Sequence, residues 1–370
     1  MKHLLLILVL GLQTFGFAQK IKKSQPLRVG VVGLVHGHVH WILNNEKKSN
    51  IEIVGIVEPN EELAKRLTKQ YGLSMDIVFD SIEEMVKETQ PEAVNAFNST
   101  FDHLETVRFC APRGIHVMVE KPLAVSWEHA KEMIALAKKH NIHLLTNYET
   151  TWYGSNQKAY DLIHNDNAIG TMRKLTFHTG HFGPKEIGCD KEFLEWLTDP
   201  KLNGGGALMD FGCYGANITT WLMKGEAPIA VTATVQQMKP EIYPKVEDDA
   251  TIILTYPGTE VVIQASWNWP HHVKDMEVFG ANGYIKCLNS SDMMIMTNEK
   301  VGSSPAMASP REPGFNDPFA LFKKVVHEGY EIEKYGLSSL ENAEMVSKIL
   351  NAAKKSSEQG KTISWEELYP

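Results

Sequence analysis

The sequence predicts an α/β protein in which a doubly wound parallel sheet is followed by an α+β domain with a large, mainly antiparallel open sheet. Apolar, strand-like runs alternate with helix-like segments for about 120 residues, which is typical of parallel sheets connected by crossover helices. Beyond Tyr148 the alternation stops and β-branched runs follow one another. We therefore expect one domain at 25–148 and a second at 149–370.

Five apolar, β-rich runs in the first half of the chain are expected to form the parallel sheet. They span residues 27–32, 51–57, 93–97, 115–119 and 142–146. Helix signals lie between them: Pro59 suits the first turn of a helix and Gly72 its end. Ser81 opens a capping box with Glu84, and Ser126 is a further N-cap. These signals predict helices that connect successive parallel strands.

The second half of the chain predicts an antiparallel sheet with helices on one face. Alternating, β-branched runs occur at 173–181, 230–237, 250–256, 260–267 and 276–280. Pro257-Gly258-Thr259 is a hairpin-type turn between two of them. Helices are expected at 157–165, from the glycine run 204–206 to Met223, at 318–328 and at 340–357. Residues 303–317, which are rich in Ser, Pro and Gly, are expected to form a loop.

The composition excludes several classes of protein. The 370 residues are 43% hydrophobic and 22% charged, which is ordinary for a globular chain with two cores. The net charge of −8 and the absence of a basic patch argue against a nucleic-acid partner. The four cysteines are scattered and form no C-x-x-C pair, so we expect no disulfide framework.

The first 18 residues have the pattern of a cleavable secretory signal peptide. A basic start precedes an apolar run at 4–12, and Gly16-Phe17-Ala18 offers small residues at the cleavage site. The run is short of the ~20 residues that a membrane span needs, and no lipid-carrying cysteine follows. We expect an exported, periplasmic protein without a span in its mature form.

The turn after the first strand is the candidate dinucleotide site of a Rossmann fold. Gly33 takes the first position of the G-x-G-x-x-G fingerprint, but Val35 and His38 replace the other two glycines. The backbone at Gly33, Leu34 and Gly37 is expected to contact the pyrophosphate, with Gly37 forming a shifted turn.

Glu58 ends the second strand, where a carboxylate binds both ribose hydroxyls and repels a 2′-phosphate. We therefore expect NAD as the cofactor, with NADP less favoured.

Three histidines in this turn raise the question of a metal. His36 and His40 are spaced i, i+4, with His38 between them, but no cysteine or carboxylate at ligand spacing accompanies them. We expect no metal here. His36 is instead expected to donate a hydrogen bond to a phosphate at the helix N-terminus.

Polar residues end the strand predicted at 115–119. Glu120-Lys121-Pro122 stops it, because proline has no N–H for the ladder. In an open parallel sheet, ligands bind at the carboxyl ends of the strands. Glu120 and Lys121 are therefore candidates for contact with a cofactor and substrate.

Three motifs make the chain resemble the glucose–fructose oxidoreductase/inositol dehydrogenase (Gfo/Idh/MocA) family. Glu120-Lys121-Pro122 matches in full, and the run Asp199 to Tyr214 matches D-P-x-x-x-G-G-G-A-L-x-D-x-G-x-H except at Tyr214. Two family branches also carry Tyr there. The stretch Asn98 to His103 keeps only the His of T-P-N-x-x-H. The resemblance implies that Asn98, His103, Glu120 and Lys121 lie at the cofactor, and that the protein forms a homodimer or tetramer.

The resemblance and the chemistry together assign candidate catalytic residues. Lys121 and Tyr214 are expected to relay the hydroxyl proton, because burial lowers the pKa of a lysine and a neighbouring ammonium lowers that of a tyrosine. Asp210, one helical turn before Tyr214, is expected to position the substrate.

Tyr148 and His181 are candidate substrate contacts. Strand alternation places His178 and His181 on opposite faces, and we favour His181. Several tryptophans could stack on a sugar ring, but each is as well explained as a core residue: Trp152, Trp196, Trp267 and Trp269.

These observations predict an exported NAD-dependent oxidoreductase that transfers hydride to or from a secondary alcohol of a sugar, glycoside or cyclitol. Two alternatives remain open. An NAD-dependent glycosidase or lyase would oxidise the sugar transiently and eliminate its aglycone. A non-catalytic carbohydrate-binding protein would explain the altered glycine fingerprint.

Overall fold

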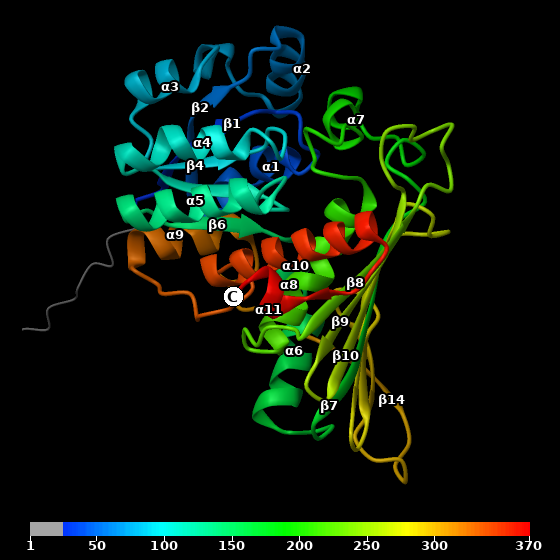
Figure 1. Ribbon diagram of the computed structural model, residues 1–370. Helices are drawn as coiled ribbons and strands as arrows, with labels where there is room; N and C mark the ends of the chain where they lie inside the picture. The colour runs from blue at the N-terminus through cyan, green and yellow to red at the C-terminus, as the bar shows by residue number, and fades with distance from the viewer. Residues whose placement is uncertain (1–24) are drawn as a thin grey trace, which may run out of the picture.

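The computed structural model describes residues 25–370, with the side chains of 45–48 excepted. The predicted signal peptide at 1–18 lies outside the described residues. Two sheets organise the chain, one built mainly from its first half and one from its second (Figure 1).

The first sheet is parallel and doubly wound, as predicted. Its order is β3-β2-β1-β4-β5-β6. The strands are β1 (Leu27–Val32), β2 (Ile51–Val57), β3 (Val78–Phe79), β4 (Ala93–Ala96), β5 (His116–Glu120) and β6 (Leu144–Asn147). The helices between them are α1 (Val39–Ser49), α2 (Glu61–Tyr71), α3 (Ile82–Thr89), α4 (His103–Cys110) and α5 (Trp127–His140). The two-residue β3 was not predicted, because so short an edge strand has no pattern of its own.

The predicted helix caps explain where these helices begin and end. Ser81 accepts a hydrogen bond from the backbone N–H of Glu84, and Ser126 accepts one from that of His129. Gly72 ends α2 in the left-handed conformation with φ of 68°. Local signals therefore set these three helix ends, whereas α2 begins after the N-cap Asn60 and Pro59 lies just before it.

The second sheet has nine strands in the order β14-β13-β12-β11-β7-β10-β9-β8-β15. Neighbours pair antiparallel except β7 and β10, so the sheet is mainly antiparallel, as predicted. The strands are β7 (Met172–Gly180), β8 (Ala230–Gln236), β9 (Asp249–Tyr256), β10 (Thr259–Ser266), β11 (Val273–Gly280), β12 (Tyr284–Cys287), β13 (Asp292–Met296), β14 (Ser304–Met307) and β15 (Ile363–Ser364).

One loop prediction in this half is wrong in part. Residues 303–317 contain the edge strand β14, in which Ser304 pairs with Ile295 and Pro305 with Met294. An edge strand needs hydrogen bonds on one side only, so it tolerates a proline that a central strand would not. Strands β12, β13 and β15 were also missed, because they are short and only partly buried.

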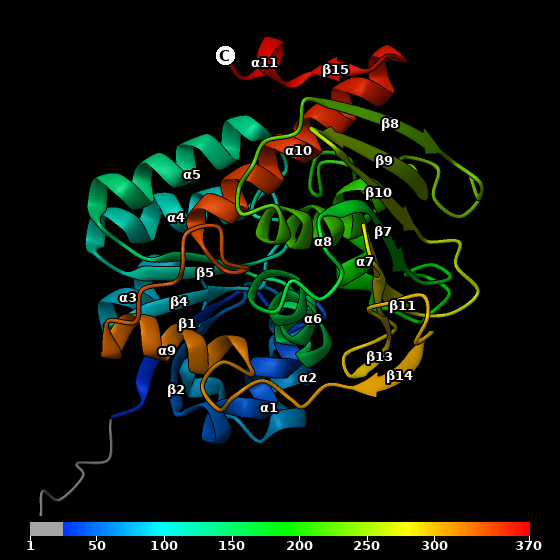
Figure 2. The same ribbon diagram turned by 90° about the horizontal axis from the view of Figure 1, so that it is seen from below.

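Helices cover one face of the second sheet. They are α6 (Gly154–Tyr160), α8 (Ala207–Leu222) and α10 (Leu340–Gln359), with the short α7 (Lys191–Leu197) in a loop and α11 (Trp365–Leu368) near the C-terminus. All 16 residues of α8 are buried. Figure 2 shows α8 beneath α10, between the two sheets. Helix α9 (Pro318–Glu328) crosses back and packs Phe319, Phe322 and Val325 into the core of the first sheet.

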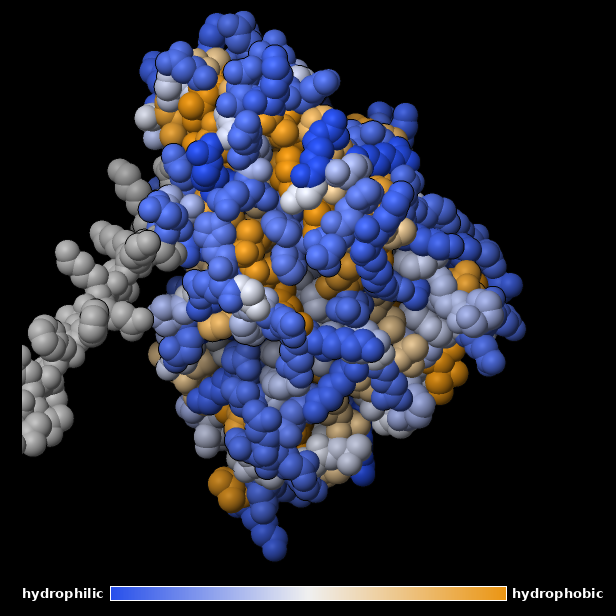
Figure 3. Space-filling view, turned by 90° about the vertical axis from the view of Figure 1, so that its left-hand side faces the viewer, coloured by the Kyte–Doolittle hydropathy of each residue, from blue (hydrophilic) through white to orange (hydrophobic). Residues whose placement is uncertain are grey.

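The face seen in Figure 3 is mostly hydrophilic, and hydrophobic residues show through in its upper part. Among residues 25–370, no helix is both long and apolar enough to traverse a bilayer.

Candidate active site

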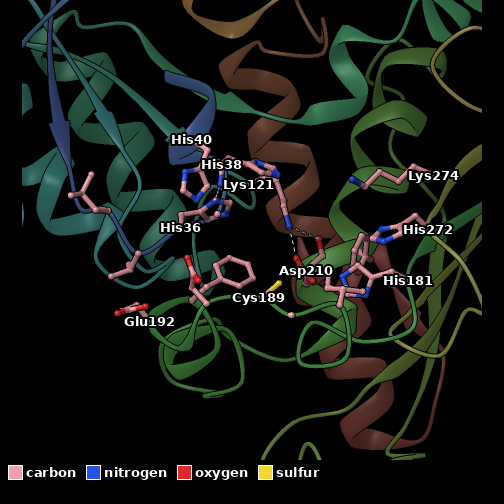
Figure 4. Close-up of a pocket in the computed structure, with 18 of the residues that line it drawn as sticks. His36, His38, His40, Lys121, His181, Cys189, Glu192, Asp210, His272 and Lys274 are labelled. Atoms are coloured by element: carbon pink, nitrogen blue, oxygen red, sulfur yellow. Dashed lines mark hydrogen bonds and ion pairs between the residues drawn. The ribbon is translucent and has the colours of Figure 1, made fainter. Parts of the chain in front are cut away.

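A cleft of ≈ 470 Å³ lies where the carboxyl ends of the first sheet face the N-terminal half of α8 and the end of β7. Figure 4 shows residues of the first sheet on one side and of the second on the other. The residues that line it include Leu34, His36, Gly37, His38, Lys121, His181, Cys189, Asp210, Tyr214, His272 and Lys274.

Lys121 and Asp210 form a buried ion pair that bridges the two sides of this cleft. The ammonium of Lys121 donates to Asp210 Oδ1 and also, at 3.0 Å, to the backbone carbonyl of Asp210. The indole N–H of Trp267 donates to Asp210 Oδ2 at 2.9 Å. The sequence offered no partner for Asp210, and the fold supplies both from distant segments.

The expected lowering of the pKa of Lys121 is wrong. Burial lowers the pKa of this ammonium, but the adjacent carboxylate of Asp210 outweighs burial, and the pKa is raised. The pKa of Asp210 is correspondingly lowered, because the charge of Lys121 overcomes the effect of burial. Lys121 is therefore held as a cation at neutral pH.

The expected lowering of the pKa of Tyr214 is also wrong, whereas the proton relay between Lys121 and its hydroxyl stays a prediction. The ammonium lies 5.2 Å from the centroid of the Tyr214 ring. Burial raises the pKa of Tyr214 well above its ordinary value, with the charge of Glu149 acting in the same direction. Tyr214 is therefore a neutral hydroxyl in the cleft.

Lys274, on β11, is a second cation in the cleft that the sequence did not single out. It pairs with Glu149, and its ammonium lies 5.1 Å from the centroid of the Tyr214 ring. Burial raises the pKa of Glu149, but the charge of Lys274 and hydrogen bonds lower it to about 2. The pair joins positions 125 residues apart, so no local pattern could reveal it.

His181 lies in the cleft, whereas His178 does not. His178 sits on β7 and bonds Asp275 Oδ1 at 2.7 Å. Burial lowers the pKa of His181 to about 4, so its ring is neutral at pH 7. His181 Nδ1 accepts a hydrogen bond from the backbone N–H of Gly183 at 3.0 Å, which places its proton on Nε2.

Tyr148 is not placed as expected. Its ring is fully buried, and it does not line the cleft. It packs edge-on against Tyr214 with ring centroids 6.1 Å apart, so it supports a residue of the site rather than facing it. Trp267, which is also fully buried, contributes through its bond to Asp210 instead of by stacking.

A second cavity of ≈ 370 Å³ continues the cleft along the ends of β1, β2 and β4. Gly33, Glu58 and Asn98 line it. Val35 and Glu192 line both cavities, so the two adjoin. Together they form an elongated space along the sheet edge where a dinucleotide binds in doubly wound folds.

The glycine turn has features that fit a dinucleotide. Gly33 has φ of +80°, and a Cβ there would lie 2.7 Å from the backbone of Asn98. Gly37 would meet nothing within 4 Å, so its backbone lies open to the cleft. Glu58 accepts hydrogen bonds at 2.9 Å from the N–H groups of Leu34 and Asn60, which fixes the carboxylate at the end of β2.

Helix α7 closes over this turn. Trp196 donates from its indole N–H to the carbonyl of Val35 at 3.4 Å and stacks on His36 with centroids 5.6 Å apart. Arg66 holds Glu192 with two hydrogen bonds of 3.2 and 3.0 Å. The second domain therefore contributes residues to the cofactor edge that the sequence assigned only to the first.

His36, His38 and Glu120 lie together, with one potential ligand atom of each within 4.8 Å of the others. The sequence showed no carboxylate near these histidines, and the fold brings Glu120 from β5. Its two oxygens already accept from Asn147 Nδ2 at 2.7 Å and pair with His38 Nδ1 at 2.8 Å. His36 Nδ1 accepts from the backbone N–H of His38 at 3.1 Å. We interpret the cluster as a hydrogen-bonded network rather than a metal centre.

Two buried imidazole nitrogens at this edge have no partner among the described residues: Nε2 of His36 and Nε2 of His103. Because His36 Nδ1 is an acceptor, its Nε2 carries the proton and is a donor. His103 Nδ1 bonds the carbonyl of Leu123 at 3.1 Å, which leaves its Nε2 an acceptor. Neither His103 nor Glu120 lines either cavity, so their expected contact with the cofactor stays a prediction.

The fold and the site define a Rossmann-type, dinucleotide-binding oxidoreductase with an appended open-sheet domain. Family models agree: the description "Oxidoreductase family, NAD-binding Rossmann fold" matches residues 27–148, and "GFO/IDH/MocA C-terminal domain" matches 156–286. The chain belongs to the Gfo/Idh/MocA oxidoreductase family.

Individual relatives are distant. Trans-1,2-dihydrobenzene-1,2-diol dehydrogenase of Xenopus tropicalis is 23% identical over 82% of this chain and 88% of its own length. D-xylose 1-dehydrogenase [NADP(+)] of Haloarcula marismortui is 25% identical over 75% of this chain and 76% of its own length. The structure of aldose-aldose oxidoreductase from Caulobacter crescentus superposes with a TM-score of 0.76 at 22% identity, covering 92% of this chain and all of that one.

Proposed function

We propose that this protein interconverts a secondary alcohol and a ketone on a sugar, glycoside or cyclitol, with NAD as the hydride carrier. The observation that carries the proposal is the Lys121–Asp210 pair, which lies in the cleft that continues into the dinucleotide edge. The names of the two relatives, one a diol dehydrogenase and one a xylose dehydrogenase, support a hydroxylated substrate.

Lys121 is the proposed proton donor and acceptor. An ammonium has three N–H groups, and two of those on Lys121 are used by Asp210. The third is available for the oxygen of the reacting carbon. A nicotinamide bound at the sheet edge would exchange the hydride with that carbon. When a ketone is reduced, Lys121 gives a proton to the oxygen, and when an alcohol is oxidised, the neutral amine takes the proton.

Other side chains in the cleft suit a polyhydroxylated ligand. His181 offers a neutral Nε2–H donor, and Tyr214 offers a hydroxyl without a protein hydrogen-bond partner among the described residues. Lys274 adds a charged donor whose position is fixed by Glu149. These groups surround the Lys121–Asp210 pair and would orient hydroxyls on neighbouring carbons.

Glu58 is the proposed basis for a preference for NAD. Its carboxylate is anchored by two backbone N–H groups at the end of β2, and a 2′-phosphate at this position would meet its negative charge. Glu58→Ala should therefore reduce the affinity for NAD and bring it closer to the affinity for NADP. Equal preference in the parent and the variant, measured by equilibrium binding, would contradict this role.

The test of the function begins with the protein as purified and with added NAD(H) and NADP(H). A panel of aldoses, glycosides and cyclitols is assayed for reduced cofactor and for released aglycone. Net reduced cofactor supports the proposal, and released aglycone without it would indicate transient oxidation followed by elimination. Lys121→Met should retain dinucleotide binding and lose turnover by about 10²-fold or more. Turnover unchanged in Lys121→Met would sink the assignment.

The pH dependence gives a second readout. Because the pKa of Lys121 is raised, the amine form is scarce at neutral pH. Alcohol oxidation should therefore accelerate about tenfold per pH unit above neutrality until the pKa is reached, whereas ketone reduction should stay level over the same range. The measurement is kcat in both directions between about pH 7 and 10.

A further inference from the structure

A third cavity, of ≈ 260 Å³, lies apart from the cleft and shares no lining residue with its two parts. Its walls come from residues 151–160, the end of α8 at Trp221, and the segment 311–338 that carries the chain from the second sheet to the first. Nothing in the proposed reaction uses these residues.

Arg311 is the one cationic residue among those that line this cavity. Its guanidinium donates to the carbonyl of Thr151 at 2.6 Å and to Gln157 Oε1 at 3.1 Å. A guanidinium has five N–H groups, so three remain without a partner among the described residues.

Arg311 forms no ion pair among the described residues. Burial lowers the pKa of its partly buried guanidinium, and the charge of Asp161, whose carboxylate accepts a hydrogen bond from Gln157 at 3.3 Å, acts in the opposite direction from beyond 4.0 Å. A partly buried cation without a contacting carboxylate is costly, and a ligand that brings a negative charge would compensate it.

The remaining wall is aromatic and aliphatic. It consists of Trp152, Tyr160, Trp221, Phe315, Leu321, Tyr330, Ile332 and Leu337. Tyr160 and Trp221 are stacked with centroids 4.3 Å apart and planes 10° apart, which makes this part of the wall rigid. The hydroxyls of Thr151 and Ser338 have no hydrogen-bond partner among the described residues. The volume is below the roughly 300–1,000 Å³ of pockets for drug-sized ligands.

We propose that this cavity binds a small carboxylate with an aromatic or aliphatic body. The carboxylate would accept two parallel hydrogen bonds from the fork of Arg311, and the body would lie against Trp221 and its neighbours. Arginine suits this role because its planar donors match a carboxylate in a bidentate pair.

Benzoate and benzyl alcohol are a matched pair of probes, since they share a ring and differ in charge. Titration calorimetry on the whole chain should show benzoate binding once per chain and benzyl alcohol at least tenfold more weakly. Arg311→Gln should weaken benzoate at least tenfold. Arg311→Lys, which keeps the charge but not the fork, should weaken it several-fold.

Two controls locate the site. Arg113→Gln, at an exposed arginine, and Lys121→Met, in the cleft, should both leave benzoate affinity unchanged. Benzoate binding that is lost in Lys121→Met and kept in Arg311→Gln would place the ligand in the cleft and overturn the proposal. Absence of benzoate binding, or equal affinity for benzyl alcohol, would also overturn it. If Arg311→Gln does not fold, an unchanged benzoate affinity in Arg311→Lys would overturn the proposal.

Discussion

Asp210→Asn isolates the electrostatic role of the central ion pair. The side chains of Asp210 and Lys121 are 5% and 6% exposed, so the substitution leaves a buried ammonium without its counter-ion. The amide is nearly the same size as the carboxylate. Its oxygen can keep the hydrogen bond from Trp267, but its NH₂ then faces the ammonium as a second donor.

The expected loss of stability follows from two limits. Removing one partner of a buried pair costs about 3–5 kcal/mol. Lys121 can escape by losing its proton, which costs about 1.4 kcal/mol for each pH unit below its ordinary pKa of 10.5. The loss is thus capped at about 4 kcal/mol near pH 7.5 and at about 1.4 kcal/mol near pH 9.5.

The sign of the pH dependence is opposite in the two proteins. In the parent, the pKa of Lys121 is higher in the folded protein than in the unfolded chain. The ion pair therefore stabilises the fold fully at any pH below the unfolded pKa, and this contribution is lost only as pH rises through the folded pKa. In Asp210→Asn, the charge of Asp210 is lost while burial, the largest influence on this pKa, remains, so the folded pKa is lowered and stability increases with pH. The gap between the two proteins should therefore narrow as pH rises.

Urea unfolding followed by tryptophan fluorescence near pH 7.5 and 9.5 measures this gap. Glu260→Gln is the matched control, because it removes an exposed ion pair with Lys174 and should cost at most about 1 kcal/mol. A loss in Asp210→Asn that equals that of Glu260→Gln, or that stays constant between the two pH values, would refute the reasoning. In a double-mutant cycle with Lys121→Met, the losses should be far from additive.

Two further predictions concern the glycine turn and the second ion pair. Gly33→Ala should destabilise the fold by roughly 1–3 kcal/mol, because φ is +80° and the new Cβ would meet the backbone of Asn98. Gly37→Ala is the control: its new Cβ would have no atom within 4 Å, so the urea midpoint should stay unchanged. Glu149 contributes stability above about pH 4.5 that is lost as pH falls toward its folded pKa of about 2, at most about 3 kcal/mol. Glu149→Gln should therefore have a smaller free energy of unfolding than the parent at pH 7, and this free energy should fall less on acidification. If the free energies of the two proteins fell in parallel with pH, the pairing with Lys274 would be contradicted.

The sequence alone determined the two-sheet architecture and part of the site. Pro122 marks the end of β5, and the glycine run at 204–206 precedes α8, so Lys121 and Asp210 each had a recognisable place. Such signals are local: they depend on a missing N–H, on a cap, or on the period of apolar residues. The altered fingerprint was also informative, because Gly33 is where a side chain cannot fit.

Only the tertiary structure decided how these residues act. Burial and a neighbouring charge shift a pKa in opposite directions, and which dominates depends on contacts made across the fold. Asp210 reverses the expected shift of Lys121, and Glu149 with Lys274 completes the cleft from 125 residues apart. Trp267 reaches Asp210 across 57 residues. Such contacts leave no periodic trace in the sequence, because they join side chains that the chain brings together only when both sheets have formed.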